Sequence, residues 1–183
     1  TDDRTDIGAS VERALDLLER IAAQDSAPML VAEAMGTDVP RLDAPPNHVP
    51  TGLAALDDRI GGFRPGQFVV VAGRPGTGKT SLLLEFAYEV ARSRPALFFT
   101  LEMPREECIW RLLSWETSIA VEKFGRRDLS ANDWTKIASA QERIAKRQLI
   151  FADAPRMTMN TIRTTCQRTR MAYGDLALVA VDY

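Results

Sequence analysis

The chain has 183 residues, of which 45% are hydrophobic and 26% are charged, proportions that are usual for a soluble globular protein. Its 23 basic and 25 acidic residues give a formal net charge of −2, which excludes a polybasic nucleic-acid-binding coat but not a local basic groove. Apolar runs such as 68–72 and 176–181 are far shorter than the roughly 20 residues that cross a bilayer. The sparse Cys108, Cys166 and His48 argue against a disulfide scaffold or a His/Cys metal site and indicate a reducing, cytoplasmic compartment.

The first fifty residues predict a helix and then a linker. Apolar residues recur at helical spacing over 10–24, with Ser10 as the N-cap. The helix either packs on its own domain or offers its apolar stripe to another subunit, and the pattern leaves both possibilities open. We therefore expect a linker helix (1–25), a proline-rich linker (26–50) and a domain that starts at 51 and is cut off at 183, in a piece of a longer protein.

From residue 51 the pattern alternates between short apolar strands and amphipathic helices. Strands are predicted at 67–72, 96–101, 149–152 and 176–181. Helices are predicted over 79–91 and in the segments that begin at Pro104, Ser130 and Thr158. The last of these helices is expected to turn Ile162, Cys166, Thr169 and Tyr173 toward the core. Continuous apolar strands separated by helices favour an α/β fold whose mostly parallel sheet is covered on both faces.

The strongest motif is Gly-Arg-Pro-Gly-Thr-Gly-Lys-Thr at 73–80, which matches the phosphate-binding pattern GxxxxGK[ST] between a strand and a helix. Its glycines let backbone N–H groups surround a phosphate, and the following helix N-terminus favours anions. Lys79 is a candidate to contact the terminal phosphates, and Thr80 to offer its hydroxyl to Mg²⁺. The alternative is a glycine-rich turn that happens to precede a lysine. The expected nucleotide-binding residues are Gly73, Arg74, Pro75, Gly76, Thr77, Gly78, Lys79, Thr80 and Ser81.

Two carboxylates are predicted at the carboxyl ends of strands, where open α/β sheets bind their ligands. Asp182 follows the run at 176–181 and either ligates Mg²⁺ or begins a surface turn. Glu102 follows the strand at 96–101 and either activates a water molecule or simply suits the N-terminus of the next helix. The residues alone do not separate these possibilities.

The order of these motifs resembles the C-terminal ATPase domain of DnaB-type replicative DNA helicases, within the RecA-like group, over residues 50–183. The matching segments are 50–53, 61–66, the Arg-Pro of the phosphate loop, 100–103 followed by Arg111, 129–134, 151–155 and 182–183. The Gly-Thr-Gly at 76–78 departs from the usual loop of that family and is similar to RadA-like recombinases.

The resemblance implies a RecA-like P-loop NTPase that binds ATP and Mg²⁺, assembles as a hexamer, moves on single-stranded DNA and unwinds the duplex during replication. It assigns phosphate contact to Lys79, metal binding to Thr80 and Asp182, and activation of the hydrolytic water to Glu102. The helix at 10–24 would dock on the neighbouring subunit. The family's DNA-binding loops and arginine finger lie further along the chain, so this piece alone should hydrolyse ATP poorly.

Other functions compete with this one. A RadA-like recombination or repair ATPase would share the fold, and the sequence that follows Tyr183 would separate it from a helicase. A non-hydrolysing nucleotide-binding assembly module would use the nucleotide as an interface switch, but Glu102 and Asp182 argue against it. A small-molecule kinase is disfavoured because no separate acceptor-binding lid is evident.

Two further groups of side chains have ordinary structural explanations. Arg163, Gln167 and Arg170 share one side of a predicted helix and form either a solvated face or a nucleic-acid contact. The tryptophans are expected to pack rather than to stack on bases; they are Trp110, Trp115 and Trp134.

Overall fold

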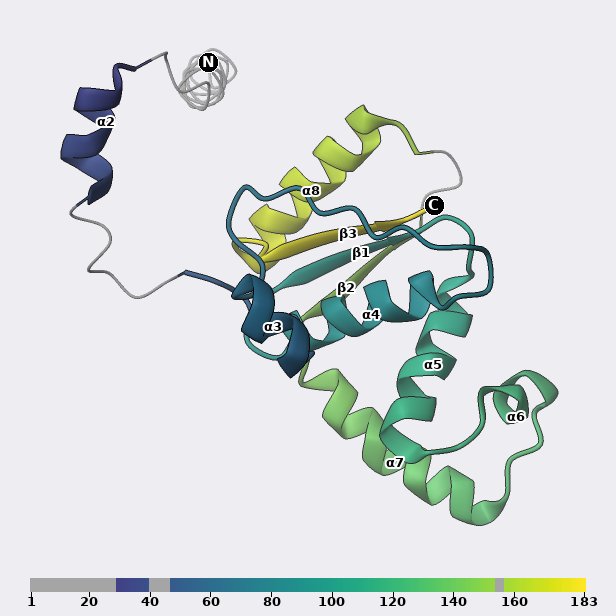
Figure 1. Ribbon diagram of the computed structural model, residues 1–183. Helices are drawn as coiled ribbons and strands as arrows, with labels where there is room; N and C mark the ends of the chain where they lie inside the picture. Colours follow the sequence, from purple (N-terminus) through teal and green to yellow (C-terminus); the bar gives the residue numbers. More distant parts are fainter. Residues whose placement is uncertain (1–28, 40–46, 154–156) are drawn as a thin grey trace, which may run out of the picture. The chain divides into compact units, whose positions relative to one another are not determined.

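The computed structural model describes residues 29–39, 47–153 and 157–183 (Figure 1). The chain divides into two compact units, 1–46 and 47–183, which we describe separately.

In the first unit, helix α2 (Val31–Asp38) lies within the stretch predicted to be an irregular linker. A helix is possible there because the residues between Pro28 and Pro40 include no proline, and proline is the residue that breaks a helix interior. Its flanking apolar side chains Leu30 and Val39 are exposed. The helix predicted at 10–24 lies outside the described residues and stays a prediction.

The second unit is built on a parallel sheet with the strand order β2-β1-β3 (Figure 1). The strands are β1 (Ala96–Thr100), β2 (Leu149–Asp153) and β3 (Leu178–Asp182). All five residues of β1 are buried, as expected for a continuously apolar strand at the centre of a sheet. In the register, Thr100 stands between Asp153 and Asp182, so the carboxyl ends of the three strands meet at one edge.

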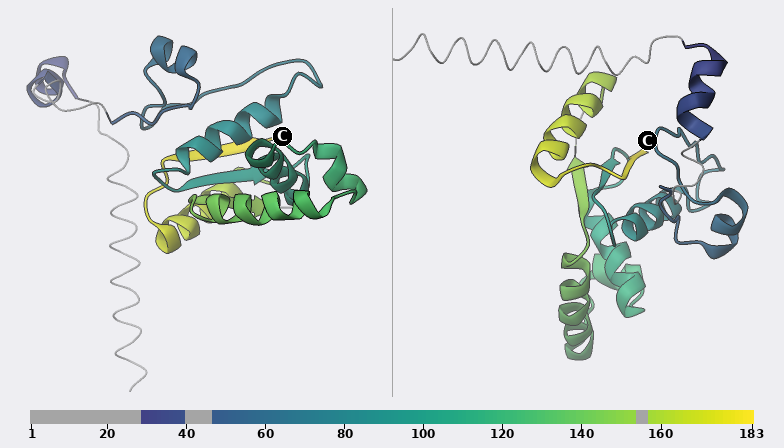
Figure 2. Two further views of the ribbon diagram at one scale, coloured as in Figure 1. Left: turned by 90° about the horizontal axis from the view of Figure 1, so that it is seen from below. Right: turned by 90° about the vertical axis from the view of Figure 1, so that its left-hand side faces the viewer.

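Helices cover both faces of this sheet, as the sequence predicts (Figure 2). Helix α4 (Lys79–Val90) packs on β1 and β3 from one side, whereas α8 (Met159–Tyr173) lies on the other. The main hydrophobic core lies between α4 and the sheet, where Leu84, Phe98 and Ala180 are buried. Burial of a single large apolar side chain of this kind contributes about 1.5–3 kcal/mol.

Three helices between β1 and β2 enclose a second, smaller apolar cluster. They are α5 (Arg105–Thr117), α6 (Val121–Arg126) and α7 (Ala131–Ala145). The cluster consists of Ile119, Phe124 and Ile137, with Trp110, Leu113 and Leu129 packed against them. The predicted cap of α7 is confirmed: the Ser130 hydroxyl accepts from the Asp133 N–H, and the Asp133 carboxylate accepts from the Ser130 N–H.

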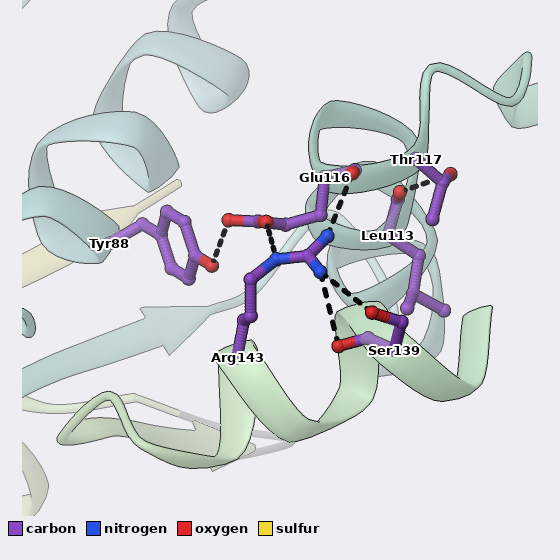
Figure 3. A network of polar contacts seen from close by, with 6 residues as sticks. All are labelled: Tyr88, Leu113, Glu116, Thr117, Ser139 and Arg143. Atoms are coloured by element: carbon purple, nitrogen blue, oxygen red, sulfur yellow. Dashed lines mark hydrogen bonds and ion pairs between the residues drawn. The ribbon is translucent and has the colours of Figure 1, made fainter. Parts of the chain in front are cut away.

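A polar network joins α4, α5 and α7 (Figure 3). The Tyr88 hydroxyl donates to Glu116 Oε1 at 2.7 Å, and Arg143 Nε donates to Oε2 of the same carboxylate at 2.7 Å. The hydrogen bonds from Arg143 and then Tyr88 hold the pKa of Glu116 below its ordinary value. The Arg147 guanidinium lies over the Tyr88 ring, 4.1 Å from its centre. The network therefore fixes α4 against the helices that follow β1.

The second unit starts with a short arm that the sequence did not predict as regular structure. Val49 and Phe63 pair through an antiparallel bridge, and both side chains are buried. Helix α3 (Ala54–Ile60) lies between them in the chain. His48 donates from its ring nitrogen Nδ1 to the Gly61 carbonyl at 2.8 Å and closes the arm.

The strand predicted at 67–72 is not formed, so this expectation is wrong. The segment and β3 line one cavity of about 740 Å³, yet no backbone hydrogen bond joins them within the described part of the chain. Phe68 is 90% exposed and Val70 is 65% exposed. An apolar β-branched run fits a pleated surface, but it becomes a strand only where a neighbouring backbone pairs with it.

Three side chains expected to pack are instead exposed, and one of them is Trp115 of α5, at 41%. Tyr173, predicted on the core side of α8, is 62% exposed, and Trp134 at the start of α7 is 58% exposed. Of the four residues predicted on that side of α8, only Thr169 is fully buried. Helical periodicity identifies which side of a helix faces the core, but not how far along the helix the packing continues.

Candidate nucleotide-binding site

The phosphate loop ends where α4 begins, at Lys79. Gly76 and Gly78 adopt φ angles of +77° and +90°, a left-handed conformation that L-residues rarely accept. The residues of the loop from 73 to 78, including Arg74 and Pro75, are exposed. The free N–H groups and the positive dipole end of α4 therefore adjoin an open loop that suits an anion.

Side chains of the loop hold its two ends together. Lys79 Nζ donates to the Gly73 carbonyl at 2.9 Å, and Thr77 Oγ1 donates to the Arg74 carbonyl at 2.7 Å. A Cβ on Gly73 would stand 2.7 Å from Thr77 Oγ1, so the first glycine is needed for space. The Lys79 ammonium is thus already placed at the loop, where a phosphate oxygen can replace the carbonyl as its acceptor.

Asp182 ends β3 directly beside the start of α4. Thr80 Oγ1 donates to Asp182 Oδ1 at 3.0 Å, whereas Asp182 Oδ2 is buried and has no hydrogen-bond partner within the described residues. Burial raises the pKa of Asp182, and the nearby negative charge of Glu102 raises it further, while the Thr80 hydrogen bond opposes both. A buried carboxylate oxygen without a partner is costly, and a cation would satisfy it.

Glu102 lies two residues beyond the end of β1 and is exposed. The backbone N–H of Leu101 donates to the Asp182 carbonyl at 3.2 Å, which ties this turn to the end of β3. The charges of both Glu102 and Lys79 act on Asp182. The fold therefore gathers Lys79, Thr80, Glu102 and Asp182 at one edge of the sheet. The basic residues of α8, Arg163, Arg168 and Arg170, are exposed on a helix on the other side of the sheet.

Two arginines at this edge were not assigned a role from the sequence. Arg111 Nη1 donates to Ser81 Oγ at 3.1 Å, and Arg105 forms an ion pair with Asp153 at 3.3 Å. A sequence signal existed for Arg111, because it stands three residues after the buried Cys108 and so interrupts the apolar stripe of α5. A basic residue on a buried stripe needs a polar partner.

A family model described as DnaB-like helicase C terminal domain matches residues 48–183. The replicative DNA helicase DnaB of Leifsonia xyli subsp. xyli (strain CTCB07) is 40% identical over 137 residues, which cover 74% of this chain and 30% of that protein. The replicative DNA helicase DnaC of Bacillus subtilis (strain 168) is 31% identical over 137 residues, with the same coverage. The chain thus spans about 30% of the length of these relatives.

Two solved structures share the fold. The ATPase domain of G40P superposes with a TM-score of 0.73 at 27% identity, over 86% of this chain and 58% of that one. A DnaB-like replicative helicase, described together with its interactions with primase, gives a TM-score of 0.74 at 26% identity, over 94% of this chain and 42% of that one. These similarities confirm the predicted RecA-like α/β core. Every helix that the structure describes is too short or too polar to span a bilayer.

Proposed function

Because the chain belongs to the family of DnaB-like helicase C-terminal domains, we propose that it is the ATP-hydrolysing part of a replicative DNA helicase. The whole protein would form a hexameric ring, move on single-stranded DNA and unwind the duplex during replication. The observation that carries the proposal is the Thr80–Asp182 contact, which brings the phosphate loop and the end of β3 to one place.

The donor atoms at this place suit a hard divalent cation. Asp182 Oδ2 is buried without a partner in the described part of the chain, and the Thr80 hydroxyl lies 3.0 Å from the other carboxylate oxygen. Mg²⁺ takes oxygen ligands and usually keeps phosphate oxygens and waters as well. Thr80 and Asp182 would therefore hold Mg²⁺ together with ATP. When bound, the ion would neutralise negative charge on the β- and γ-phosphates.

The remaining residues divide the work of hydrolysis. The amides of the phosphate loop and the N-terminus of α4 would bind the phosphates, and Lys79 would exchange the Gly73 carbonyl for a phosphate oxygen. Glu102 would accept a proton from a water molecule. The oxygen of that water would attack the γ-phosphorus, and the bond between the γ-phosphorus and ADP would break. Its exposure at the open edge of the sheet supports this role, since solvent reaches the carboxylate there.

A recombination ATPase of the RadA type would use the same site. The 40% identity to a replicative helicase supports the helicase over that alternative. A non-hydrolysing assembly module would keep the phosphate loop but would not need a carboxylate beside it. The Leu101 N–H donates to the Asp182 carbonyl and ties the turn that carries Glu102 to the end of β3, which supports an enzyme.

Lys79→Ala in the full-length protein tests the proposal. The change removes the ammonium at the phosphate loop, so we expect DNA-stimulated ATP hydrolysis to fall by about 100-fold or more and unwinding to be lost. Lys136→Ala, on the exposed side of α7, is the matched control and should retain both activities. Undiminished hydrolysis in Lys79→Ala, or a wild-type protein that hydrolyses no ATP, would overturn the proposed function.

A further inference from the structure

The Arg111 side chain connects the two halves of the candidate site. It projects from α5, is half-buried, and donates from Nη1 to Ser81 Oγ at 3.1 Å. Its Nε donates to Met103 Sδ at 3.3 Å. Ser81 directly follows Thr80 in α4, and Met103 directly follows Glu102 after β1. One guanidinium therefore joins the phosphate-loop helix to the turn that carries Glu102.

The chemistry of the guanidinium suits this bridging position. Its N–H donors point in fixed directions within one plane, so two acceptors that it binds are held at a set separation. The thioether of Met103 is a weak acceptor, but Met103 is also held from its backbone, because the Thr100 hydroxyl donates to the Met103 carbonyl. The residue after Glu102 is thus anchored through both its main chain and its side chain.

No carboxylate lies within ion-pair distance of Arg111 among the residues that the structure describes. Its guanidinium instead binds two neutral acceptors, Ser81 Oγ and Met103 Sδ. By contrast, Arg105 on the same helix is paired with Asp153 and is 57% exposed. The two arginines of α5 therefore differ in surroundings, and only Arg111 faces the candidate site.

We propose that Arg111 is a positioning residue, which fixes Glu102 relative to the phosphate loop by binding Met103 on one side and Ser81 on the other. This inference rests on the proposed ATPase function. Arg111 acts through its neighbours, so it sets the orientation of the base and not the affinity for the nucleotide. Misplacement of a reacting group by a distance of the order of 1 Å costs about 100-fold in rate.

The test compares Arg111→Met and Arg111→Lys with the wild type in the full-length protein. Methionine has a similar length but no donors, and lysine keeps the charge without the planar pair of donors. We expect both changes to lower kcat for ATP by about 10- to 100-fold, while KM and the directly measured nucleotide Kd change by less than about threefold. Arg105→Met is the matched control and should leave kcat unchanged.

A double-mutant cycle identifies the route of the effect. Met103→Leu keeps the volume but removes the sulfur acceptor, so adding it to Arg111→Met should lower kcat by less than the product of the two single effects. Thermal unfolding of each variant checks that the fold is intact. If Arg111→Met does not fold, Met103→Leu alone serves as the test.

The outcomes separate this inference from the function on which it rests. A wild type that does not hydrolyse ATP would overturn both. Normal hydrolysis in Arg111→Met, full rescue of kcat by lysine, or a loss confined to KM and nucleotide Kd would overturn the positioning role alone. The last result would mean that Arg111 contacts the nucleotide directly.

Discussion

Thr80 Oγ1 donates a hydrogen bond to Asp182 Oδ1 at 3.0 Å, although the two residues stand 102 positions apart in the chain. The contact forms because α4 begins at the phosphate loop and β3 ends at the same edge of the sheet. It leaves the second carboxylate oxygen, Oδ2, buried beside the hydroxyl. Two proposed Mg²⁺ ligands are thereby held next to each other by rigid elements, and such preorganisation favours tight metal binding.

Thr80→Val tests the role of the hydroxyl. Valine matches the shape of threonine but cannot ligate a cation, so the Mg²⁺ concentration that gives half-maximal ATP hydrolysis should rise by about 10- to 100-fold. Thr80→Ser keeps the hydroxyl and should behave almost as the wild type does. The measurement is a Mg²⁺ titration of the full-length enzyme at fixed ATP. An unchanged titration midpoint in the valine variant would contradict the proposed ligand role.

We predict that Asp182 destabilises the folded protein at neutral pH, although ATP hydrolysis requires it. Burial raises its pKa above the ordinary value of 3.8. The folded carboxyl therefore binds its proton more readily than the unfolded one, and stability falls as the pH rises from the unfolded pKa through the folded pKa. Asp182→Asn removes this titration, so it should be more stable than the wild type at neutral pH and should hydrolyse no ATP.

Asp153→Asn is the control for that experiment. Asp153 ends the strand on the other side of β1, but it is exposed and paired with Arg105 at 3.3 Å. The asparagine there should leave ATP hydrolysis intact and change stability little. Urea unfolding from mildly acidic to neutral pH gives the comparison. If Asp182→Asn is less stable than the wild type at neutral pH, burial of the Asp182 carboxylate does not destabilise the folded protein as inferred.

Local signals in the sequence predict several features of the fold correctly. Ser130 and Asp133 are three residues apart and cap α7 as expected, and helix α4 begins at Lys79 as the motif requires. The strand expected at 67–72 depends on a distant backbone partner, and apolar composition does not supply one. Trp134 is exposed because packing at the end of a helix depends on its neighbours in space.

The same distinction applies to the candidate site. The phosphate loop is recognisable because its spacing encodes its chemistry, and Asp182 because it ends an apolar run. The role of Arg111 cannot be predicted from the sequence, since both of its acceptors, Ser81 and Met103, belong to other parts of the fold. A basic residue in an apolar stripe indicates that a partner exists but not which one.

Tyr88 determines how the network between α4 and α5 responds to alkaline pH. Burial raises the pKa of Tyr88 from 10.0 to about 12, and its hydrogen bond to Glu116 contributes to the increase. The folded protein thus holds the phenolic proton more tightly than the unfolded chain, so stability is lost as the pH rises from 10.0 to about 12. Tyr88→Phe cannot ionise and should lose less stability over this range.

At neutral pH the same variant should be less stable than the wild type by about 1 kcal/mol, because Glu116 loses a hydrogen-bond donor in a partly buried network. Tyr173→Phe, at a position that is 62% exposed, is the control. Its stability should match that of the wild type at neutral pH and over the alkaline range. Urea unfolding monitored by circular dichroism gives the free energies. If Tyr88→Phe and the wild type lose stability equally over the alkaline range, another group causes the alkaline loss of stability. If the two proteins are equally stable at neutral pH, the hydrogen bond from Tyr88 to Glu116 makes no net contribution to the free energy of unfolding.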